Sequence, residues 1–365
     1  MSRIVLVTPY ALSIFGGVQE QVLAMSRELA TRGHDVSVIA PDGADEARYD
    51  TPARVYRFGP RLRVPANGSR APLTLSARAA ARALELVRAI EPDVVHLHEP
   101  FAPLLGYRIL AARPAPLVGT FHRSGDGPAV RVTRPLLRAL GRRLDVAVAV
   151  SDAAARTMGA AAHLRPEILF NGFEIDRYRQ IERLEPERPT LLVVGRLEER
   201  KGVATVVDAL RLHNASSEMP WRLVVLGDGP RRAELESRAG DADVVFLGAA
   251  SDEVKRRWLR SASVLVAPAL RGESFGLVLL EGMAAELVVV ASDIDGYRAA
   301  AGGHAVLVRP DDPQDLVRGV EAALRMGEEA RGAALAHARR WSMGALVERY
   351  EEIYERARRR WSSSR

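Results

Sequence analysis

The sequence contains no cysteine, few aromatic residues and no long apolar run. Because Cys is 0 among 365 residues, the chain has neither disulfides nor thiolate metal sites, which fits a reducing cytoplasm. Aromatic residues make up only 5% of the chain, which argues against a surface of interleaved basic and aromatic side chains that binds nucleic acid. No stretch contains the roughly 18 consecutive apolar residues that indicate a membrane-spanning helix. We therefore expect a cytoplasmic protein that binds no nucleic acid and contacts a membrane, if at all, peripherally on its inner face.

Length and charge indicate two soluble domains with an affinity for phosphate groups. The 365 residues suit two domains of about 150–200 residues each. Apolar residues account for 47% and charged residues for 27%, as in ordinary globular proteins. The net charge of +6 is carried mainly by arginine and favours phosphates, whether in nucleic acid, anionic lipid or a nucleotide sugar.

Short β-branched runs alternate with helical patterns along the whole chain, which is typical of parallel sheets built from βαβ units. Several of these runs are continuously apolar, so we expect helices on both faces of each sheet. The predicted fold class is α/β, with two Rossmann-like, doubly wound domains that face a central cleft and bind ligands beyond the carboxyl ends of their strands. The expected strands are Arg3–Val7, Asp35–Ile39, Asp93–Leu97, Leu117–Phe121, Asp145–Val150, Glu167–Phe170, Thr190–Val194, Arg222–Leu226, Val244–Leu247, Ser263–Ala267, Leu287–Ala291 and Ala305–Val308.

The expected domain boundaries follow from a charged, proline-containing segment without periodicity. The first domain is assigned to residues 1–178, the linker to 179–189 and the second domain to 190–342. Residues 343–365 are interpreted as a helix that crosses back to the first domain.

Candidate functional residues in the first half follow the ends of expected strands. Gly16 and Gly17 precede a long amphipathic helix, where their backbone amides can meet an anion, although for such a pair alone a plain strand-to-helix turn is the favoured interpretation. The loop lacks the G-x-G-x-x-G pattern of nicotinamide dehydrogenases. His96, His98 and His122 lie at two strand ends, where functional groups gather. For His96 and His98 a hydrogen-bonded structural role is the simpler interpretation, and no third residue has the spacing of a zinc ligand.

In the second half, cations and carboxylates follow strand ends in the same way. Arg196 and Lys201 flank the loop after the strand Thr190–Val194, where they can hold a diphosphate as a planar fork and a point charge. The alternative is a solvated charged loop. Asp241-Ala242-Asp243 and Asp293-Ile294-Asp295 match a metal-binding D-x-D pattern that is frequent by chance, and neither is taken as a site.

The strongest pattern is a pair of glutamates eight positions apart, Glu273 and Glu281. Glu273 lies in a loop and Glu281 about two turns inside the helix that follows. A buried glutamate without a ligand or basic partner costs several kcal/mol, so two of them indicate hydrogen bonds to a polyol. Helix capping by Glu273 explains one acid only. Backbone amides from Ser274 to Leu277 would point toward an anion or sugar hydroxyls at the helix start.

With these motifs the chain resembles the retaining GT-B glycosyltransferases of family 4, and within them the mannosyltransferases that act on phosphatidylinositol. The resemblance runs from the first strand to the last helices and rests on Pro9-Tyr10, Gly16-Gly17-Val18-Gln19, Asn67-Gly68-Ser69, His98-Glu99-Pro100, Thr120-Phe121-His122, Gly195-Arg196, Lys201-Gly202 and Gly272-Glu273-Ser274-Phe275-Gly276 with Glu281.

The resemblance implies a role for each matching residue. It implies that Arg196 and Lys201 neutralise the leaving diphosphate, that Glu281 binds the ribose and that Glu273 holds the transferred sugar beside His122. Metal is not expected to be required, nor any other cofactor. The remaining implied donor-binding residues are Gly16, Gly17, Ser274, Phe275, Gly276 and Leu277, and the implied acceptor-binding residues are Tyr10, Gln19, Asn67 and Ser69.

The implied reaction moves mannose from GDP-mannose to a phosphatidylinositol-type lipid or a related cell-envelope glycan, as in phosphatidylinositol mannoside biosynthesis. Two alternatives remain open: a UDP-sugar donor with a soluble acceptor, and a sugar-nucleotide epimerase of the same architecture.

The sequence departs from the family pattern at two places. The helix that the resemblance implies would hold anionic membrane, residues 76–88, carries three arginines diluted by alanine and one glutamate, and a surface helix packed on the sheet explains it about as well. Glu286 stands where the family commonly has glycine, and its role is not assigned.

Overall fold

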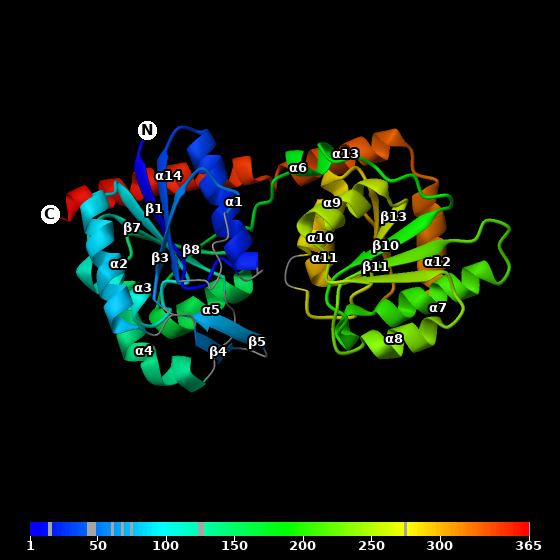
Figure 1. The fold of residues 1–365 in the computed structure, drawn as a ribbon, viewed down its shortest axis with the longest axis horizontal. Coiled ribbons are helices and arrows are strands. Elements are labelled where there is room, and N and C mark those ends of the chain that lie inside the picture. The colour runs from blue at the N-terminus through cyan, green and yellow to red at the C-terminus, as the bar shows by residue number, and fades with distance from the viewer. Residues whose placement is uncertain are drawn as a thin grey trace. The chain divides into compact units, whose positions relative to one another are not determined.

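The computed structural model describes residues 1–13, 17–41, 49–59, 62–66, 69–73, 76–122, 128–273 and 276–364, with side chains other than those of 62–66, 69–73, 128–131 and 179. The chain divides into two compact α/β units (Figure 1). Unit 1 comprises Met1–Phe173 together with Met343–Arg365, and unit 2 comprises Glu174–Ser342. The C-terminal residues 343–365 thus belong to the same unit as the N-terminus.

Unit 1 is built on a seven-stranded sheet in the order β3-β2-β1-β6-β7-β8-β9. All its neighbouring strands pair in parallel. The order reverses between β1 and β6, which places the ligand-binding crevice of such a sheet at the carboxyl ends of these two strands. The strands are β1 (Arg3–Val7), β2 (Asp35–Pro41), β3 (Arg54–Phe58), β6 (Val94–His98), β7 (Leu117–Phe121), β8 (Val146–Ala149) and β9 (Glu167–Ile168).

Helices cover both faces of this sheet, as the continuously apolar strands require. On β1, Ile4 and Leu6 pack on the face covered by α1 and α14. Val5 and Val7 pack on the opposite face, against α2 and α3. The helices of unit 1 are α1 (Gly17–Thr31), α2 (Ala77–Ile90), α3 (Leu105–Ala112), α4 (Pro128–Gly141), α5 (Asp152–Ala162) and α14 (Met343–Ser363).

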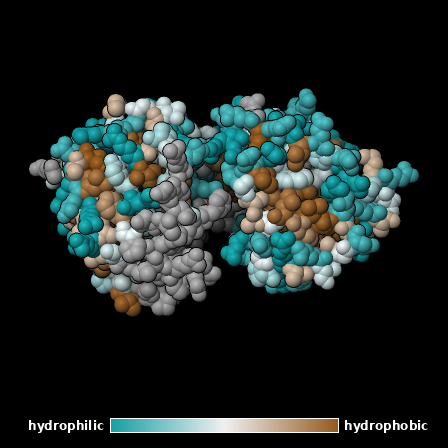
Figure 2. Space-filling view, viewed as in Figure 1, coloured by the Kyte–Doolittle hydropathy of each residue, from teal (hydrophilic) through white to brown (hydrophobic). Residues whose placement is uncertain are grey.

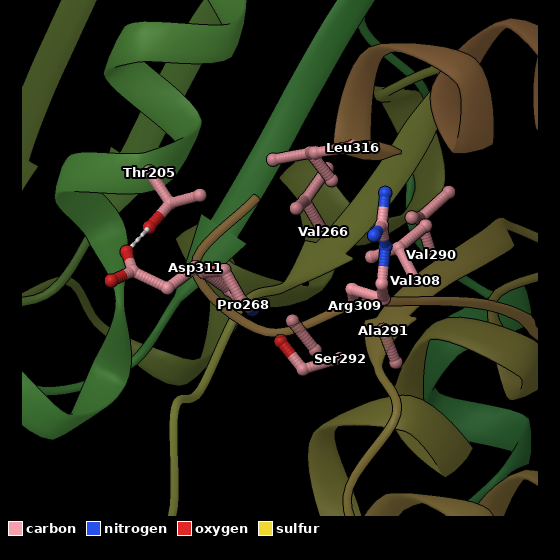
Figure 3. A pocket seen from close by; sticks show the side chains of 11 residues that line it. Thr205, Val266, Pro268, Val290, Ala291, Ser292, Val308, Arg309, Asp311 and Leu316 are labelled. Atoms are coloured by element: carbon pink, nitrogen blue, oxygen red, sulfur yellow. Dashed lines mark hydrogen bonds between the residues drawn. The ribbon is translucent and has the colours of Figure 1, made fainter. Parts of the chain in front are cut away.

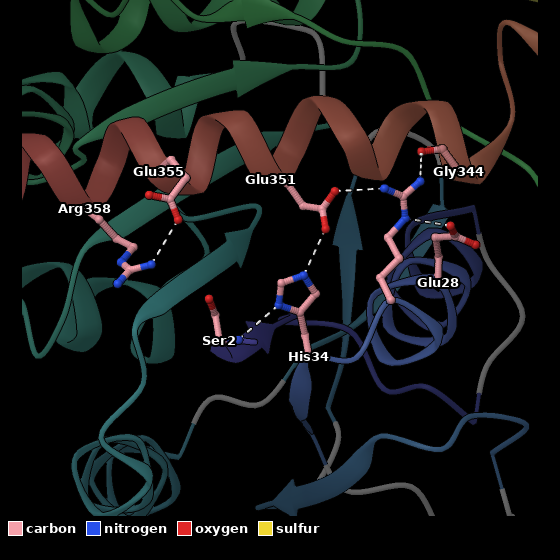
Figure 4. A network of polar contacts seen from close by, with 8 residues as sticks. Ser2, Glu28, His34, Gly344, Glu351, Glu355 and Arg358 are labelled. Carbon is pink, nitrogen blue, oxygen red and sulfur yellow. Dashed lines mark hydrogen bonds and ion pairs between the residues drawn. The ribbon is translucent and has the colours of Figure 1, made fainter.

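A polar network fastens α14 to the N-terminal part of unit 1 (Figure 4). The Glu351 carboxylate lies 2.9 Å from His34 Nε2 and 2.8 Å from Arg32 Nη1. Arg32 also donates to the Gly344 carbonyl at 2.9 Å. Because the Ser2 amide donates to His34 Nδ1, a neutral His34 carries its proton on Nε2 and donates it to Glu351. These contacts join three segments that lie far apart in the sequence.

Three strands of unit 1 were not expected from the sequence. β3 is an edge strand with Arg54 and Arg57 exposed, so it lacks the apolar run of the central strands. β4 (Leu62–Ala66) and β5 (Ser69–Leu73) form a separate antiparallel hairpin.

Unit 2 repeats the same plan with six parallel strands in the order β12-β11-β10-β13-β14-β15. The order reverses between β10 and β13, again at the position where doubly wound sheets bind ligands. The strands are β10 (Thr190–Val194), β11 (Arg222–Leu226), β12 (Val244–Gly248), β13 (Val264–Ala267), β14 (Val288–Ser292) and β15 (Val306–Val308). The helices are α6 (Asp176–Arg179), the 3-10 turn η1 (Glu199–Lys201), α7 (Val203–Asn214), α8 (Arg232–Ala239), α9 (Asp252–Ser261), α10 (Leu277–Ala284), α11 (Asp295–Ala301), α12 (Pro313–Leu324) and α13 (Glu328–Arg339).

The boundary between the units differs from the one expected. Residues 174–178 were assigned to the first domain, whereas they belong to unit 2. The reason is local: Tyr178 donates to Glu281 Oε1 at 2.9 Å, and Arg256 donates to the Arg177 carbonyl at 3.3 Å. These side-chain contacts cannot be inferred from the charge and proline content that marked the linker.

Candidate active site

The carboxyl edge of the unit 2 sheet brings two distant loops together. Gly202, at the end of η1, has φ +65°, and a Cβ on it would lie 2.0 Å from the Pro268 carbonyl oxygen. Only glycine permits so close an approach. The Leu270 amide donates to the Arg200 carbonyl at 2.8 Å, so the loop after β13 is fixed against the loop after β10. Arg200 and Lys201 of the loop after β10 consequently lie beside the Glu273 carboxylate of the loop after β13.

Glu273 is held between two cations at this edge. Its Oε1 lies 2.5 Å from Lys201 Nζ and 2.9 Å from Arg200 Nη1. The Glu273 side chain is only 14% exposed, so its charge needs partners of this kind. Lys201 was expected here from the sequence, whereas Arg200 was not.

A second carboxylate orients the arginines of the same loop. Glu198 lies 3.2 Å from Arg196 Nε through one oxygen and 2.9 Å from Arg200 Nε through the other. The Arg196 side chain is 65% exposed, so its guanidinium remains accessible. The edge therefore presents three cations against the carboxylates of Glu198 and Glu273, an arrangement that suits a polyanionic ligand.

Glu281 has a cation of its own. It lies on α10, and its Oε1 is 3.0 Å from Lys255 Nζ of α9 and 2.9 Å from the Tyr178 hydroxyl of α6. The chain contains only two lysines, Lys201 and Lys255, and each pairs with one of the two predicted glutamates. Lys255 and Tyr178 were missed, although the scarcity of lysine was a signal that could have singled out Lys255.

The start of α10 completes the described part of this edge. Gly276, with φ +78°, directly precedes the helix at Leu277, and a Cβ on it would lie 2.7 Å from the Tyr297 ring. Ser274 and Phe275, two predicted donor-binding residues, lie outside the described residues.

A small cavity lies beside the carboxyl ends of β13, β14 and β15 (Figure 3). Its volume is about 10 Å³, which suits a single water molecule. Thr205 donates to Asp311 across its rim at 2.9 Å. A cavity of this size does not hold a nucleotide.

The two D-x-D segments are accounted for by ion pairs. Asp243 pairs with Arg222 at 3.0 Å and with Arg188 at 3.2 Å, and Asp293 pairs with Arg298. Within the described part of the chain, no group of three or more histidine, aspartate or glutamate side chains is placed to hold a metal ion.

At the corresponding edge of unit 1, three histidine rings stack in a row. The ring centroids of His96 and His98 are 4.4 Å apart, and those of His98 and His122 are 5.3 Å apart. His98 Nδ1 lies 3.0 Å from His122 Nε2, and the His122 amide donates to Glu99 Oε1 at 2.7 Å. The row, termed the histidine stack below, leads from the core of unit 1 to the carboxyl end of β7.

Burial keeps the histidine stack neutral. Desolvation lowers the pKa of His96 to about 3, with a further contribution from His122. Desolvation likewise lowers the pKa of His122 to about 4. It also holds the pKa of His98 well below its usual range, helped by the two neighbouring rings. All three imidazole rings are therefore uncharged near neutral pH.

The inner end of the histidine stack has a structural role. His96 Nδ1 lies 2.8 Å from the Tyr354 hydroxyl, and its Nε2 lies 2.7 Å from Thr120 Oγ1. Thr120 Oγ1 also lies 2.8 Å from the Tyr350 hydroxyl. Both tyrosines belong to α14, so the simpler interpretation of His96 as a hydrogen-bonded core residue agrees with its contacts. His98 differs, because it also contacts the candidate catalytic His122.

We expect Thr120→Val to destabilise unit 1 by about 2–4 kcal/mol, because it leaves His96 Nε2 and the Tyr350 hydroxyl buried without this partner. Urea denaturation followed by circular dichroism measures the effect. Thr157→Val is the matched control, since it removes a hydroxyl that bonds the Ala153 carbonyl of its own helix at 2.8 Å and leaves the network of His96 intact. Equal stability of the two variants would contradict a role for this network.

The other predicted residues of unit 1 are placed only in part. Gln19 is buried, and its Nε2 lies 3.5 Å from the Ala11 carbonyl oxygen. Tyr10 follows β1, with its amide donating to Thr8 Oγ1. Gly17 begins α1. Gly16 and Asn67 lie outside the described residues, as does the side chain of Ser69.

Two family models match the chain in succession. The model described as Glycosyltransferase Family 4 matches residues 15–177, and the model described as Glycosyl transferases group 1 matches residues 188–326. Both describe transferases, so the epimerase alternative is set aside.

Relatives of known name match nearly the whole chain. A phosphatidyl-myo-inositol mannosyltransferase of Mycobacterium tuberculosis is 34% identical, over 97% of this chain and 96% of that protein. The protein of the same name from Mycolicibacterium smegmatis is 35% identical, over 96% and 94%. That from Propionibacterium freudenreichii is 30% identical, over 93% and 92%.

Solved structures share the fold of both units. A glycosyltransferase from Rickettsia africae has a TM-score of 0.75 at 17% identity and covers 98% of each chain. Anabaena HepE in complex with UDP has a TM-score of 0.68 at 18% identity, over 97% of this chain and 99% of that one. The predicted α/β fold of two Rossmann-like domains is confirmed. Together with the relatives at 30–35% identity, these findings show that the chain is an enzyme that belongs to glycosyltransferase family 4.

Proposed function

We propose that this glycosyltransferase moves mannose from GDP-mannose onto a phosphatidylinositol-type lipid with retention of the anomeric configuration. The observation that carries the proposal is the pairing of the only two lysines with Glu273 and Glu281 at the carboxyl edge of unit 2. The relatives named phosphatidyl-myo-inositol mannosyltransferase support mannose as the sugar and an inositol lipid as the acceptor.

In this proposal the cations of unit 2 bind the donor diphosphate. Arg196 is exposed and oriented by Glu198, and its planar guanidinium donates hydrogen bonds to the phosphate oxygens. Lys201 supplies the compact positive charge of its ammonium group. Lys201 then exchanges part of its contact with Glu273 for a phosphate oxygen. This exchange frees Glu273 to accept hydrogen bonds from the hydroxyls of the sugar, while Glu281 accepts from the hydroxyls of the ribose.

The bond changes need no protein nucleophile. The bond between the sugar anomeric carbon and the β-phosphate oxygen breaks, and the acceptor oxygen bonds that carbon from the same face. The acceptor proton passes to the leaving phosphate. Lys201 and Arg196 stabilise the negative charge that develops on this phosphate, which is the largest electrostatic change of the reaction.

His122 contributes as a neutral side chain. Its pKa of about 4 excludes an imidazolium near neutral pH. Because His98 engages Nε2, Nδ1 is the ring atom that His122 can present to the sugar. His98 would thereby set the tautomer of His122.

The remaining residues of unit 1 are proposed to contact the two substrates. The acceptor would contact Tyr10, Gln19, Asn67 and Ser69. The donor diphosphate would lie near the backbone of Gly16 and Gly17. The proposed location is the inner face of the cell membrane, reached from the cytoplasm.

We expect catalysis to be independent of metal, because Arg196 and Lys201 supply the charge that a divalent cation would otherwise provide. Sugar transfer measured in EDTA should equal that in the untreated enzyme. Loss of activity in EDTA, restored by Mg²⁺ or Mn²⁺, would show that protein cations do not suffice.

Calorimetric titration with GDP, UDP and ADP tests the donor site. We expect GDP to bind most tightly, and Arg196→Ala and Glu281→Ala each to weaken it by about 10–100-fold, the effect of one hydrogen bond to a charged group. Arg318→Ala on α12 is the control, since among the described residues Arg318 forms its ion pair with the nearby Asp315 alone. A preference for UDP would favour the alternative of a UDP-sugar donor. No nucleotide binding would contradict the proposed site.

A further inference from the structure

The interior of unit 1 holds polar groups that its fold alone does not require. On the surface, hydrophilic residues surround a few small hydrophobic patches in the view of Figure 2, and within the described part of the chain no helix is long and apolar enough to cross a membrane. The interior, in contrast, contains His98 at the carboxyl end of β6, with only 1% of its surface exposed. Buried polar groups almost always have hydrogen-bond partners, so the partners of His98 and of the adjacent Glu99 indicate what these two residues do.

Glu99 ends the hydrogen-bond ladder between β6 and β7. In continuation of the parallel register that pairs His98 with Thr120, the Glu99 amide donates to the Thr120 carbonyl at 2.8 Å. The next bond of a parallel ladder would join the His122 amide to the Glu99 carbonyl. That carbonyl instead accepts from the Ala102 amide at 2.9 Å, because the chain turns away from the sheet at this point.

The Glu99 side chain takes the place of the Glu99 carbonyl. Its Oε1 accepts from the His122 amide at 2.7 Å, so a carboxylate supplies the acceptor that the turned backbone has withdrawn. A hydrogen bond from an amide to a charged oxygen is stronger than one to a neutral carbonyl. The first residue beyond β7 is thereby held to the end of the sheet. This residue, His122, is the one proposed to lie beside the transferred sugar.

The conformation of Glu99 is strained, and its surroundings fix it. Its φ is +53°, in the left-handed region that disfavours residues with a Cβ. Leu104 of the same loop has φ +67°. The loop is closely packed, since a Cβ on Gly106 of α3 would lie 2.2 Å from the Pro100 carbonyl oxygen. Strained residues persist where the surrounding structure fixes them, and they gather at functional sites, so the strain at Glu99 points to a functional position.

His98 fixes the ring of His122. Its Nδ1 lies 3.0 Å from His122 Nε2, and because both rings are uncharged, one of these nitrogens donates and the other accepts. The second nitrogen of His98, Nε2, is buried and has no hydrogen-bond partner among the described residues. A buried N–H group without an acceptor is rarer in proteins than an acceptor without a donor. His98 therefore carries its proton on Nδ1 and donates it to His122 Nε2, and the proton of His122 lies on Nδ1.

We propose that Glu99 and His98 are positioning residues for His122: Glu99 holds its backbone amide at the end of the sheet, and His98 holds its ring with the proton on Nδ1. His122 thus presents an uncharged N–H donor to an oxygen of the transferred sugar. The proposal rests on the proposed function in that His122 contacts this sugar. Both positioning residues follow each other on one strand, so a single rigid element fixes ring and backbone. A displacement of about 1 Å in such a site lowers the rate by on the order of 10²-fold.

Substitutions of Glu99 test the backbone contact in assays of mannose transfer. Glu99→Gln keeps an acceptor oxygen at the same reach and should retain most of kcat. Glu99→Ala and Glu99→Gly both remove this oxygen, and each should lower kcat by about 10–100-fold with little change in KM for GDP-mannose. Glycine suits φ +53° and alanine does not, so Glu99→Gly should unfold at a higher urea concentration than Glu99→Ala. Equal losses of kcat at unequal stability separate positioning from a structural role.

The matched control for glycine at a left-handed position is Glu91→Gly. Glu91 ends α2 with φ +50°, and its side chain is exposed. This variant should change neither kcat nor KM, because Glu91 lies at the opposite end of β6 from Glu99. Full kcat in Glu99→Ala, or a kcat that follows stability across the three Glu99 variants, would overturn the assignment of Glu99.

The tautomer of His122 tests the ring contact without any assay of activity. In protein labelled at the ring nitrogens of histidine, NMR distinguishes an imidazole protonated on Nδ1 from one protonated on Nε2. The chain has 8 histidines, and the signal missing from His122→Gln identifies that of His122. We expect the proton on Nδ1 in the unaltered protein and in His98→Asn, whose amide group still donates to His122 Nε2. His98→Leu has no donor, so it should populate the Nε2 tautomer and lower kcat by about 10–100-fold.

The outcomes separate the positioning proposal from the proposed function. A proton on His122 Nε2 in the unaltered protein, or an unchanged tautomer in His98→Leu, would overturn the assignment of His98. Full mannose transfer by an enzyme with the Nε2 tautomer contradicts the positioning proposal alone. An unaltered enzyme that transfers no mannose contradicts the proposed function alone, because the tautomer of His122 and its dependence on His98 are measured without substrate.

Discussion

Replacing Lys201 with alanine is expected to lower kcat for sugar transfer by about 10²–10³-fold, the effect of removing one group that stabilises developing charge in a transition state. Lys201 is one of two cations in contact with Glu273, at 2.5 Å. Arg200 remains on Glu273 in the variant, at 2.9 Å, so the carboxylate keeps a partner and the fold should persist. Steady-state kinetics with GDP-mannose separates kcat from KM.

The split between kcat and KM decides the role of Lys201. A loss in kcat indicates charge stabilisation in the transition state, whereas a rise in KM alone indicates ground-state binding of the donor. Lys201→Arg should recover only part of the activity, because the planar guanidinium differs in shape from a compact ammonium group. Arg318→Ala controls for loss of positive charge elsewhere in unit 2. Unchanged kcat in Lys201→Ala would contradict the proposed mechanism.

The second large effect is expected in acid. The folded-state pKa values of His96 and His122 are lowered to about 3 and about 4 from the usual 6.5, and that of His98 is lowered as well. Below pH 6.5 the unfolded chain therefore binds protons that the folded chain does not. The stability contributed by the neutral histidine stack is complete above pH 6.5 and is lost as the pH falls toward 4 and then 3. Each histidine lowers the free energy of unfolding by up to about 1.4 kcal/mol per pH unit in this range.

Urea denaturation at a series of pH values measures this dependence. His98→Asn, whose amide can replace Nδ1 without titrating at these pH values, should reduce the slope between pH 6.5 and 4. His163→Asn is the matched control, because His163 is an exposed residue at the end of α5 in the left-handed conformation that asparagine tolerates. The control should keep the full slope. Identical pH profiles of the two variants would show that the histidine stack does not govern acid sensitivity.

The strands that position the site were predictable because buried parallel strands leave continuous apolar runs. Thr190–Val194 and Arg222–Leu226 were expected with the same limits that β10 and β11 have. β3 gave no such signal, since an edge strand exposes one flank and tolerates Arg54 and Arg57 there. The charged residues of this edge strand therefore hid it from the sequence pattern.

Of the site residues, the sequence predicted only those that lie in the loops and helix starts directly after a strand. Glu273 and Glu281 were found because two carboxylates flank one helix start. Lys255 and Tyr178 reach Glu281 from α9 and α6, and only packing in space reveals such contacts. The sequence shows Arg200 only as one charge of a charged loop, and its distance of 2.9 Å to Glu273 assigns it to the site.

Glu286, to which the sequence assigned no role, has a structural explanation. It adopts φ +61°, a left-handed conformation that favours glycine. For other residues this conformation costs about 1–2 kcal/mol. Its carboxylate lies 3.2 Å from Arg260 and 3.8 Å from Arg183, and these ion pairs offset part of that strain. The residues preceding β14 thereby contact the segment that precedes β10.

Transfer of radiolabelled mannose from GDP-mannose to phosphatidylinositol in detergent micelles tests the central claim most directly. The purified enzyme should place the label in the lipid extract and yield GDP, and it should not transfer glucose from UDP-glucose. Lys201→Ala should reduce the labelled lipid by the factor given above. Label in the lipid from a UDP-sugar but not from GDP-mannose would contradict the donor assignment. No labelled lipid from any nucleotide sugar, from a protein that still binds GDP, would contradict the proposed acceptor.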